Sequence, residues 1–214
     1  METDNKLLND AYRIAAGDIV GNIVYYQNGL LTEEKPCMIA GLDYNTPWTR
    51  DTAINIWNAL SILSPEVSKN TLLAVLEEEE GNIYIGGQYW DSIIWMIGAR
   101  EYCRFHKDDN FYRLAFEAGR NSVHRLEEDE FDEEDGLFRG PAVYGDGIAA
   151  YPDKYSKCPN QGSGILEWVD YPGNPVYPKG YGIPMKALST NCVYFKAYEI
   201  LAEMAHALGE PAKE

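Results

Sequence analysis

The amino-acid sequence predicts an all-α protein with about six helices in antiparallel hairpins and a long irregular loop near residues 128–187. Apolar residues recur at three- and four-residue steps over most of the chain, as they do on one face of a helix. No stretch alternates apolar and polar residues for long enough to make a useful strand. Residues 127–187 hold nine of the 19 glycines and seven of the 11 prolines, so the helical pattern stops there. Loops of this length inside a compact domain usually carry function.

The first predicted helix covers roughly residues 4–27 and is amphipathic. Its apolar face consists of Leu8, Tyr12, Ala15, Ile19, Ile23 and Tyr26. Glycine, proline and asparagine recur over residues 28–48, which are therefore expected to form a loop. A second helix is expected over roughly residues 51–63.

The third predicted helix has a strong start signal. Ser64 suits the cap, Pro65 suits the first helical position and Glu66 is an acid in the first turn. This helix is expected to reach about Glu79, with the acidic run at its end solvated. Residues 81–87 then read as a short loop with room for a small β-turn.

Three more helices are expected in the second half of the chain. The fourth is marked by Trp90, Ile93, Ile94, Ile97, Tyr102 and Phe105, and the fifth by Phe111, Leu114, Ala115, Ala118 and Leu126. The last helix is expected to run from a Ser189 cap to Leu208, because Gly209 and Pro211 then stop it. A length of 214 residues suits a single domain over residues 1–214.

Composition narrows the class of function. The formal net charge of −16 argues against nucleic acid and against docking on an anionic membrane, since both need clustered basic residues. The 16 tyrosines and five tryptophans suit pockets that stack on a ligand and also hydrogen-bond to it, although tyrosine also fills half-exposed core positions. A neutral ligand such as a sugar fits both features.

Cysteine and histidine spacing gives no metal site. The four cysteines are scattered without a C-x-x-C pair, and the three histidines fall on separate predicted helices. The acids of residues 127–135 lack the register of a calcium loop and read as a solvated run. No cofactor and no metal are therefore expected. Reduced thiols and the lack of a visible signal peptide favour a cytoplasmic location.

The first candidate site lies at the start of the second predicted helix, in the stretch Trp48-Thr49-Arg50-Asp51. A guanidinium fork beside a carboxylate can grip a vicinal diol, and a preceding indole can stack on a sugar ring. The alternative is structural: Asp51 caps its helix and Arg50 pairs with a surface acid.

A second stretch repeats the pattern of aromatic residues before an acid. Tyr89, Trp90 and Asp91 stand at the start of the fourth predicted helix. Two such stretches at two helix N-termini are expected to face the same end of a bundle. We therefore expect them to line one sugar-binding pocket.

The third candidate site lies in the long loop. Asp146 stands between two glycines and follows Tyr144 closely, so a tightly turned backbone can present its carboxyl. A protonated carboxyl of this kind is the general acid that cleavage of a glycosidic bond needs. The alternative reading of Asp146 is an ordinary Asx-type turn residue.

These stretches resemble the six-hairpin, (α/α)6-toroid glycosidases, which include glucoamylases, glycogen-debranching glucosidases and trehalases. The close match is Trp48-Thr49-Arg50-Asp51 followed by an apolar helix. In glucoamylase-type members the matching Arg-Asp pair holds the sugar in the cleaved subsite, which implies binding roles for Arg50 and Asp51. The stretch from Tyr144 to Asp146 is similar in placement to the one that carries the general acid, which implies that role for Asp146.

The resemblance implies an incomplete toroid. The full toroid has twelve helices, and its catalytic base comes from a late hairpin, whereas this sequence predicts about six. The chain is then the N-terminal half of a larger catalytic domain, or another chain supplies the rest. The implied activity is inverting, glucosidase-like glycoside hydrolysis of an oligo- or polysaccharide, and the isolated chain is expected to lack the base.

Two other functions stay open on the sequence. One is a non-catalytic carbohydrate-binding or inactive toroid fragment, and the other is a helical scaffold that binds protein. The long glycine- and proline-rich loop and the lack of a fixed repeat period argue against the scaffold. An incomplete toroid also leaves apolar faces in water, so self-association is expected.

Overall fold

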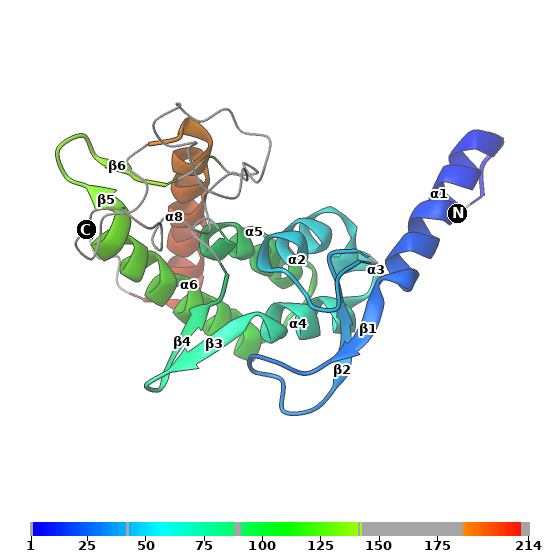
Figure 1. Ribbon diagram of the computed structural model, residues 1–214, viewed down its shortest axis with the longest axis horizontal. Helices are drawn as coiled ribbons and strands as arrows, with labels where there is room; N and C mark the ends of the chain where they lie inside the picture. The colour runs from blue at the N-terminus through cyan, green and yellow to red at the C-terminus, as the bar shows by residue number, and fades with distance from the viewer. Residues whose placement is uncertain (1, 42, 88–90, 141, 143–185, 211–214) are drawn as a thin grey trace, which may run out of the picture.

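The computed structural model describes residues 2–41, 43–87, 91–140, 142 and 186–210. Within this part of the chain the protein is mostly helical, with short two-stranded antiparallel sheets between the helices (Figure 1). The helices are α1 (Lys6–Gly21), α2 (Thr49–Asn55), the π-helical η1 (Ile56–Leu60), α3 (Ser61–Leu63), α4 (Pro65–Ala74), α5 (Asp91–Phe105), α6 (Asp109–Glu130) and α8 (Leu188–Leu208). The strands are β1 (Ile23–Tyr26), β2 (Lys35–Met38), β3 (Leu76–Glu79), β4 (Asn82–Ile85), β5 (Phe131–Asp132) and β6 (Leu137–Phe138).

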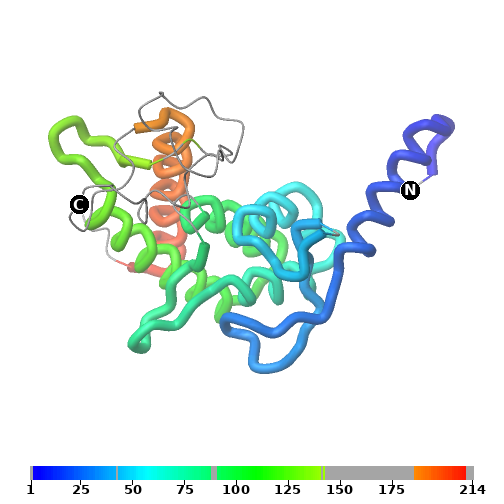
Figure 2. The backbone as a smooth tube through the Cα atoms, viewed as in Figure 1, coloured from blue at the N-terminus to red at the C-terminus, as the bar shows by residue number. Residues whose placement is uncertain are grey.

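The helix predicted over residues 4–27 is shorter than expected. Helix α1 ends at Gly21, and the chain then enters β1, in which Ile23 pairs with Met38 of β2. Ile23 and Tyr26 continue the three- and four-residue spacing of α1, but β-branched and aromatic residues also favour a strand. No residue of α1 is buried, and the helix projects from the body of the molecule (Figure 2).

The second and third helices follow the predicted order. Residues 49–63 are continuously helical through α2, η1 and α3, with a π-helical segment in the middle. Helix α4 starts at Pro65, as expected, and ends at Ala74.

The predicted extension of the third helix to Glu79 is wrong. Residues 76–79 form β3, which pairs with β4 so that Glu77 lies opposite Tyr84. Glu80 and Gly81 join the strands with φ of 51° and 81°. Positive φ at both central residues is the hairpin geometry that matches the twist of paired strands. The acidic run is therefore a hairpin arm, not the end of a helix.

Helices α5, α6 and α8 form the second half of the described fold. Tyr102 and Phe111 lie ring to ring near the α5–α6 turn, 5.0 Å apart, and Met96 contacts Gly119 further along. The two helices are thus antiparallel. Gly119 is also close to Leu201 of α8.

The direction of α8 follows from its contacts with α6. Glu127, near the end of α6, accepts a hydrogen bond from Tyr198, whereas the earlier Gly119 meets the later Leu201. Helix α8 therefore runs opposite to α6 and in the same direction as α5. Helix α6 extends through Glu130 and β5 follows, so the predicted loop near 128–187 begins with regular structure.

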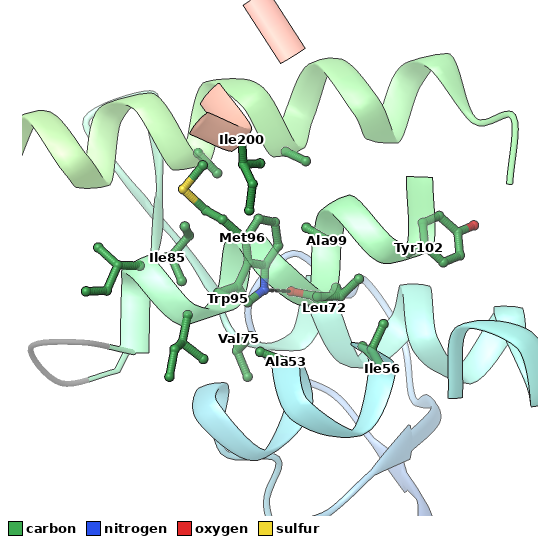
Figure 3. Close-up of a cluster of buried hydrophobic side chains, with 14 of the residues drawn as sticks. Ala53, Ile56, Leu72, Val75, Ile85, Trp95, Met96, Ala99, Tyr102 and Ile200 are labelled. Carbon is green, nitrogen blue, oxygen red and sulfur yellow. Dashed lines mark hydrogen bonds between the residues drawn. The ribbon is translucent and has the colours of Figure 1, made fainter. Parts of the chain in front are cut away.

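Helix α5 lies at the centre of the described fold, because it contacts α2, α4, α6 and α8. The core is centred on its fully buried Trp95, whose indole nitrogen donates to the Leu72 carbonyl oxygen at 3.3 Å (Figure 3). Other core side chains come from α2, η1, β4 and α8. No helix in the described ranges has the length and apolar character needed to cross a bilayer.

Candidate functional site

The starts of α2 and α5 meet at one loop. The Thr49 hydroxyl donates to the Gly86 carbonyl oxygen at 2.8 Å. Gly87 has a φ of +112°, and a β-carbon there would stand 2.7 Å from Oδ2 of Asp91 and 2.9 Å from Oγ1 of Thr49. Only glycine fits a backbone held this tightly at positive φ. The first turns of two parallel helices therefore lie side by side.

An aromatic surface stands at this helix end. Trp48 is the N-cap residue of α2, has extended backbone and is 39% exposed. Tyr44 is also exposed, and its ring meets Trp48 edge to face at a centroid distance of 6.1 Å. The pair thus offers an exposed indole beside a phenol at the helix start. Rings of this kind stack on apolar sugar faces and hydrogen-bond at their polar edges.

Arg50 and Asp51 occupy the first turn of α2, and both are half-buried. The Nη1 atom of Arg50 is buried, so part of the guanidinium fork lies inside the protein. Asp51 is not the N-cap residue of α2, because Trp48 holds that position and Asp51 lies in the first turn. An acid in the first turn is still favoured by the positive end of the helix dipole.

Asp91 lies deeper than Arg50 and Asp51. It is 5% exposed, starts α5 and borders Gly87. A carboxylate buried in this first turn is stabilised by the helix dipole and can hold the loop that carries Gly86 and Gly87. Asp91 was predicted as a sugar-binding residue, and the structure places its buried carboxylate against Gly87. The predicted site residues Tyr89, Trp90, Tyr144 and Asp146 lie outside the described residues.

The two ends of the long segment that carries Tyr144 and Asp146 are joined. Gly140 and Lys186 form a parallel β-bridge. The Lys186 ammonium also forms ion pairs with Asp132 and Asp135, with N–O distances of 2.7 and 2.6 Å. The Arg139 guanidinium pairs with Asp132 at 2.8 Å. The hydrogen bond from Lys186, then that from the backbone of Glu134, lowers the pKa of Asp132 to about 2.

The Asn191 side chain connects β6 to the start of α8, a role that the sequence analysis did not predict. Its Oδ1 accepts from the Phe138 amide at 2.8 Å, and its Nδ2 donates to the carbonyl oxygens of Phe138 and Ala187, each at 3.0 Å. One side chain thus joins β6 to the first turn of α8. An asparagine at the start of a helix that follows a long loop was the signal in the sequence. The segment therefore leaves and re-enters the fold beside the start of α8.

The starts of α2, α5 and α8 lie at one end of the described fold. Helices α2, α5 and α8 run in the same direction, and each begins with buried polar side chains, among them Thr49, Asp91 and Thr190. Their aligned dipoles make this end favourable for carboxylates and other acceptor groups.

No cluster of three or more histidine, cysteine, aspartate or glutamate side chains suited to a metal occurs within the described ranges. Comparison of the chain with family models, with curated proteins and with solved structures finds no significant match.

Proposed function

We propose that this chain binds carbohydrate at the joined starts of α2 and α5, as part of an inverting, glucosidase-like glycoside hydrolase. The observation that carries the proposal is the placement of an exposed tryptophan beside an arginine and an aspartate on one helix turn. Trp48 is open to solvent, Arg50 and Asp51 lie two and three residues after it, and Gly87 brings the start of α5 against the same turn.

Each group has a role in holding a sugar. Trp48 stacks on the apolar face of a pyranose ring. Arg50 donates to hydroxyl oxygens, and Asp51 accepts from hydroxyl hydrogens, so that the pair grips a vicinal diol. Asp91 positions the Gly86–Gly87 loop from below. This set of groups suits a neutral polyol, in keeping with a chain of net charge −16.

The proposed reaction uses Asp146 as general acid. Its carboxyl donates a proton to the leaving glycosidic oxygen. The tethering of Gly140 to Lys186 supports this role, because it anchors the segment that contains Asp146 beside the start of α8. A second carboxylate that activates water is required on the opposite face of the sugar. We propose that it comes from the hairpins that complete an (α/α)6 toroid, in which α2, α5 and α8 are inner helices.

Sugar binding by matched tryptophan variants tests the proposal. Trp48 and Trp57 are both well exposed, at 39% and 51%, and Trp48 caps the continuous helical stretch that contains Trp57. A panel of gluco-oligosaccharides is titrated into the chain, and saturation-transfer NMR reports binding. We expect Trp48→Ala to lose the signal and Trp57→Ala to keep it. Equal signals for the two variants, or none with the unaltered chain, overturn the proposal.

A further inference from the structure

A cleft lies between α6, the β5–β6 hairpin and α8, on elements that do not contribute Trp48, Arg50 or Asp51. Its volume is about 460 Å³, within the range of small-molecule pockets. Aromatic side chains make most of its wall: Phe131, Phe138, Tyr194, Phe195 and Tyr198. Glu127 is the one carboxylate among its described lining residues.

Two of the aromatic side chains form the buried base of the cleft. Phe138 and Tyr194 are buried and stack face to face, with centroids 3.6 Å apart and planes 7° from parallel. The ring centroids of Phe131 and Phe138 are 5.0 Å apart, and Phe131 is 38% exposed. Phe195 is 68% exposed and also lines the cleft. The cleft thus presents open aromatic surface over a fixed base.

Two polar side chains of the described cleft lining, Asn191 and Tyr198, already donate their hydrogen bonds within the protein. Both amide hydrogens of Asn191 are used by the carbonyl oxygens of Phe138 and Ala187. The Tyr198 hydroxyl donates to Oε1 of Glu127. Burial, then this hydrogen bond, raises the pKa of the Tyr198 phenol, so its hydroxyl stays protonated as the donor. The described lining therefore offers a carboxylate acceptor and aromatic faces.

Among the described lining residues, the donors of Asn191 and Tyr198 are already used by protein acceptors. A cation needs no donor from the protein, and it is attracted both to aromatic faces and to a carboxylate. The chain's net charge of −16 also attracts cations to the protein.

We propose that this cleft binds a small organic cation, an alkylammonium group with hydrocarbon substituents, between the exposed rings of Phe131 and Phe195 and beside Glu127. The site is separate from the proposed carbohydrate site in position and in chemistry, and either proposal can fail without the other.

Choline and its neutral isostere 3,3-dimethylbutan-1-ol test the charge requirement. The two have the same shape, so only the cationic head distinguishes them. NMR titration of the chain should show saturable binding of choline, with its methyl protons shifted upfield by the aromatic rings. The isostere should bind more weakly by about fivefold or more, as expected for a cation–π contact beside a carboxylate. Equal affinity for the two overturns the proposal, and so does the absence of choline binding.

Paired glutamate variants locate the site. Glu127→Gln keeps the side-chain shape and removes the charge, and it should weaken choline binding by about fivefold or more. Glu128→Gln removes a neighbouring charge from the same helix, outside the cleft lining, and should change binding little. Phe195→Leu tests the ring at an exposed position, where folding is not at risk, and should also weaken binding. Equal effects of the two glutamine variants would place the cation elsewhere and overturn the assignment.

Discussion

Gly98 of α5 lies directly against the backbone of Ala53 in α2. A β-carbon at residue 98 would stand 2.8 Å from the α-carbon of Ala53 and 2.9 Å from its carbonyl oxygen. Both helices must therefore approach more closely than side chains normally allow. This approach holds the two helix starts together at Gly87, and with them Trp48 and Arg50.

We expect Gly98→Ala to destabilise the fold. The added methyl meets backbone atoms, which cannot move aside as a flexible side chain can, and overpacking of this kind costs about 1–3 kcal/mol. Alanine regains up to about 1 kcal/mol in helix propensity, so the net loss is smaller than the steric cost alone. Urea unfolding followed by circular dichroism measures the difference.

Gly17→Ala is the matched control, because residue 17 is also helical and a β-carbon there meets nothing within 4 Å. This variant should keep or raise stability. A Gly98→Ala protein as stable as the Gly17→Ala protein contradicts the tight α2–α5 contact.

The sequence was sufficient for features that depend on local spacing. The order of the helices and the start of α4 at Pro65 followed from periodicity and cap residues. The sequence-based prediction was wrong where helix and strand patterns overlap. Ile23 fits the apolar face of α1, but it pairs with Met38 in a sheet. For the same reason, the acidic residues of β3 were predicted as the end of a helix, and the β3–β4 hairpin was missed.

Contacts between distant residues were beyond local reasoning. The motif Trp48-Thr49-Arg50-Asp51 marked a candidate site, but its contact with the start of α5 depends on Gly87 and on Gly98, whose roles appear only once the helices are packed. The exchange of hydrogen bonds between Asn191 and Phe138 spans 53 residues of chain and has no periodic signal. The amphipathic pattern of α1 likewise indicated an apolar face but not whether that face is covered.

Asp108 should make stability depend on pH. It caps α6 by accepting from the Phe111 amide at 3.0 Å and binds Lys69 at 2.5 Å. The Lys69 hydrogen bond, more than that from Phe111, lowers the pKa of Asp108 in the folded protein. Its contribution is therefore present above the unfolded pKa, about 3.9, and is lost as pH falls through the lower folded value.

The Asp108→Asn variant isolates the charge, because asparagine is an equally good cap. It should be less stable than the unaltered protein at pH 7 by up to about 1 kcal/mol, since the ion pair is partly exposed. The difference should shrink as pH falls below about 4. Adding Lys69→Met to Asp108→Asn should cost little more than either change alone. A stability gap that stays constant from pH 7 to pH 3 contradicts the ion-pair assignment.

The cysteines should differ in reactivity. Burial raises the pKa of the Cys37 thiol to about 11 and that of Cys103 to about 12, so both stay protonated near neutral pH. Cys192 is exposed on α8. Iodoacetamide at pH 7.5, with peptide mapping by mass spectrometry, should modify Cys192 at least about 100-fold faster than the other two, because the thiolate is the nucleophile. In urea the three rates should converge. Early modification of Cys37 in the folded protein contradicts its burial.

The proposed mechanism makes separate predictions for Asp146 and Arg50 in the complete enzyme. Asp146→Asn removes the proton donor and should lower turnover of natural glycosidic linkages by about 10²-fold or more. Aryl glycosides with activated leaving groups should lose much less, because those groups need little protonation. Arg50→Ala removes part of the sugar grip and should weaken catalytic efficiency on both substrate types alike. The chain alone should bind sugar and turn over neither substrate, because the water-activating carboxylate is expected roughly 6.5–9.5 Å from the acid on a partner segment.

Steady-state kinetics of both variants on both substrates separate these roles. A substrate-dependent loss for Asp146→Asn and a uniform loss for Arg50→Ala support the assignment, because only a proton donor distinguishes leaving groups by their basicity. Arg50→Lys serves as the control for charge: it keeps the cation but loses the planar fork, so it should fall between the unaltered enzyme and Arg50→Ala. An Asp146→Asn enzyme with full activity on natural linkages excludes Asp146 as the acid. Sugar binding by the Trp48 variants is measured separately, so it can survive that result.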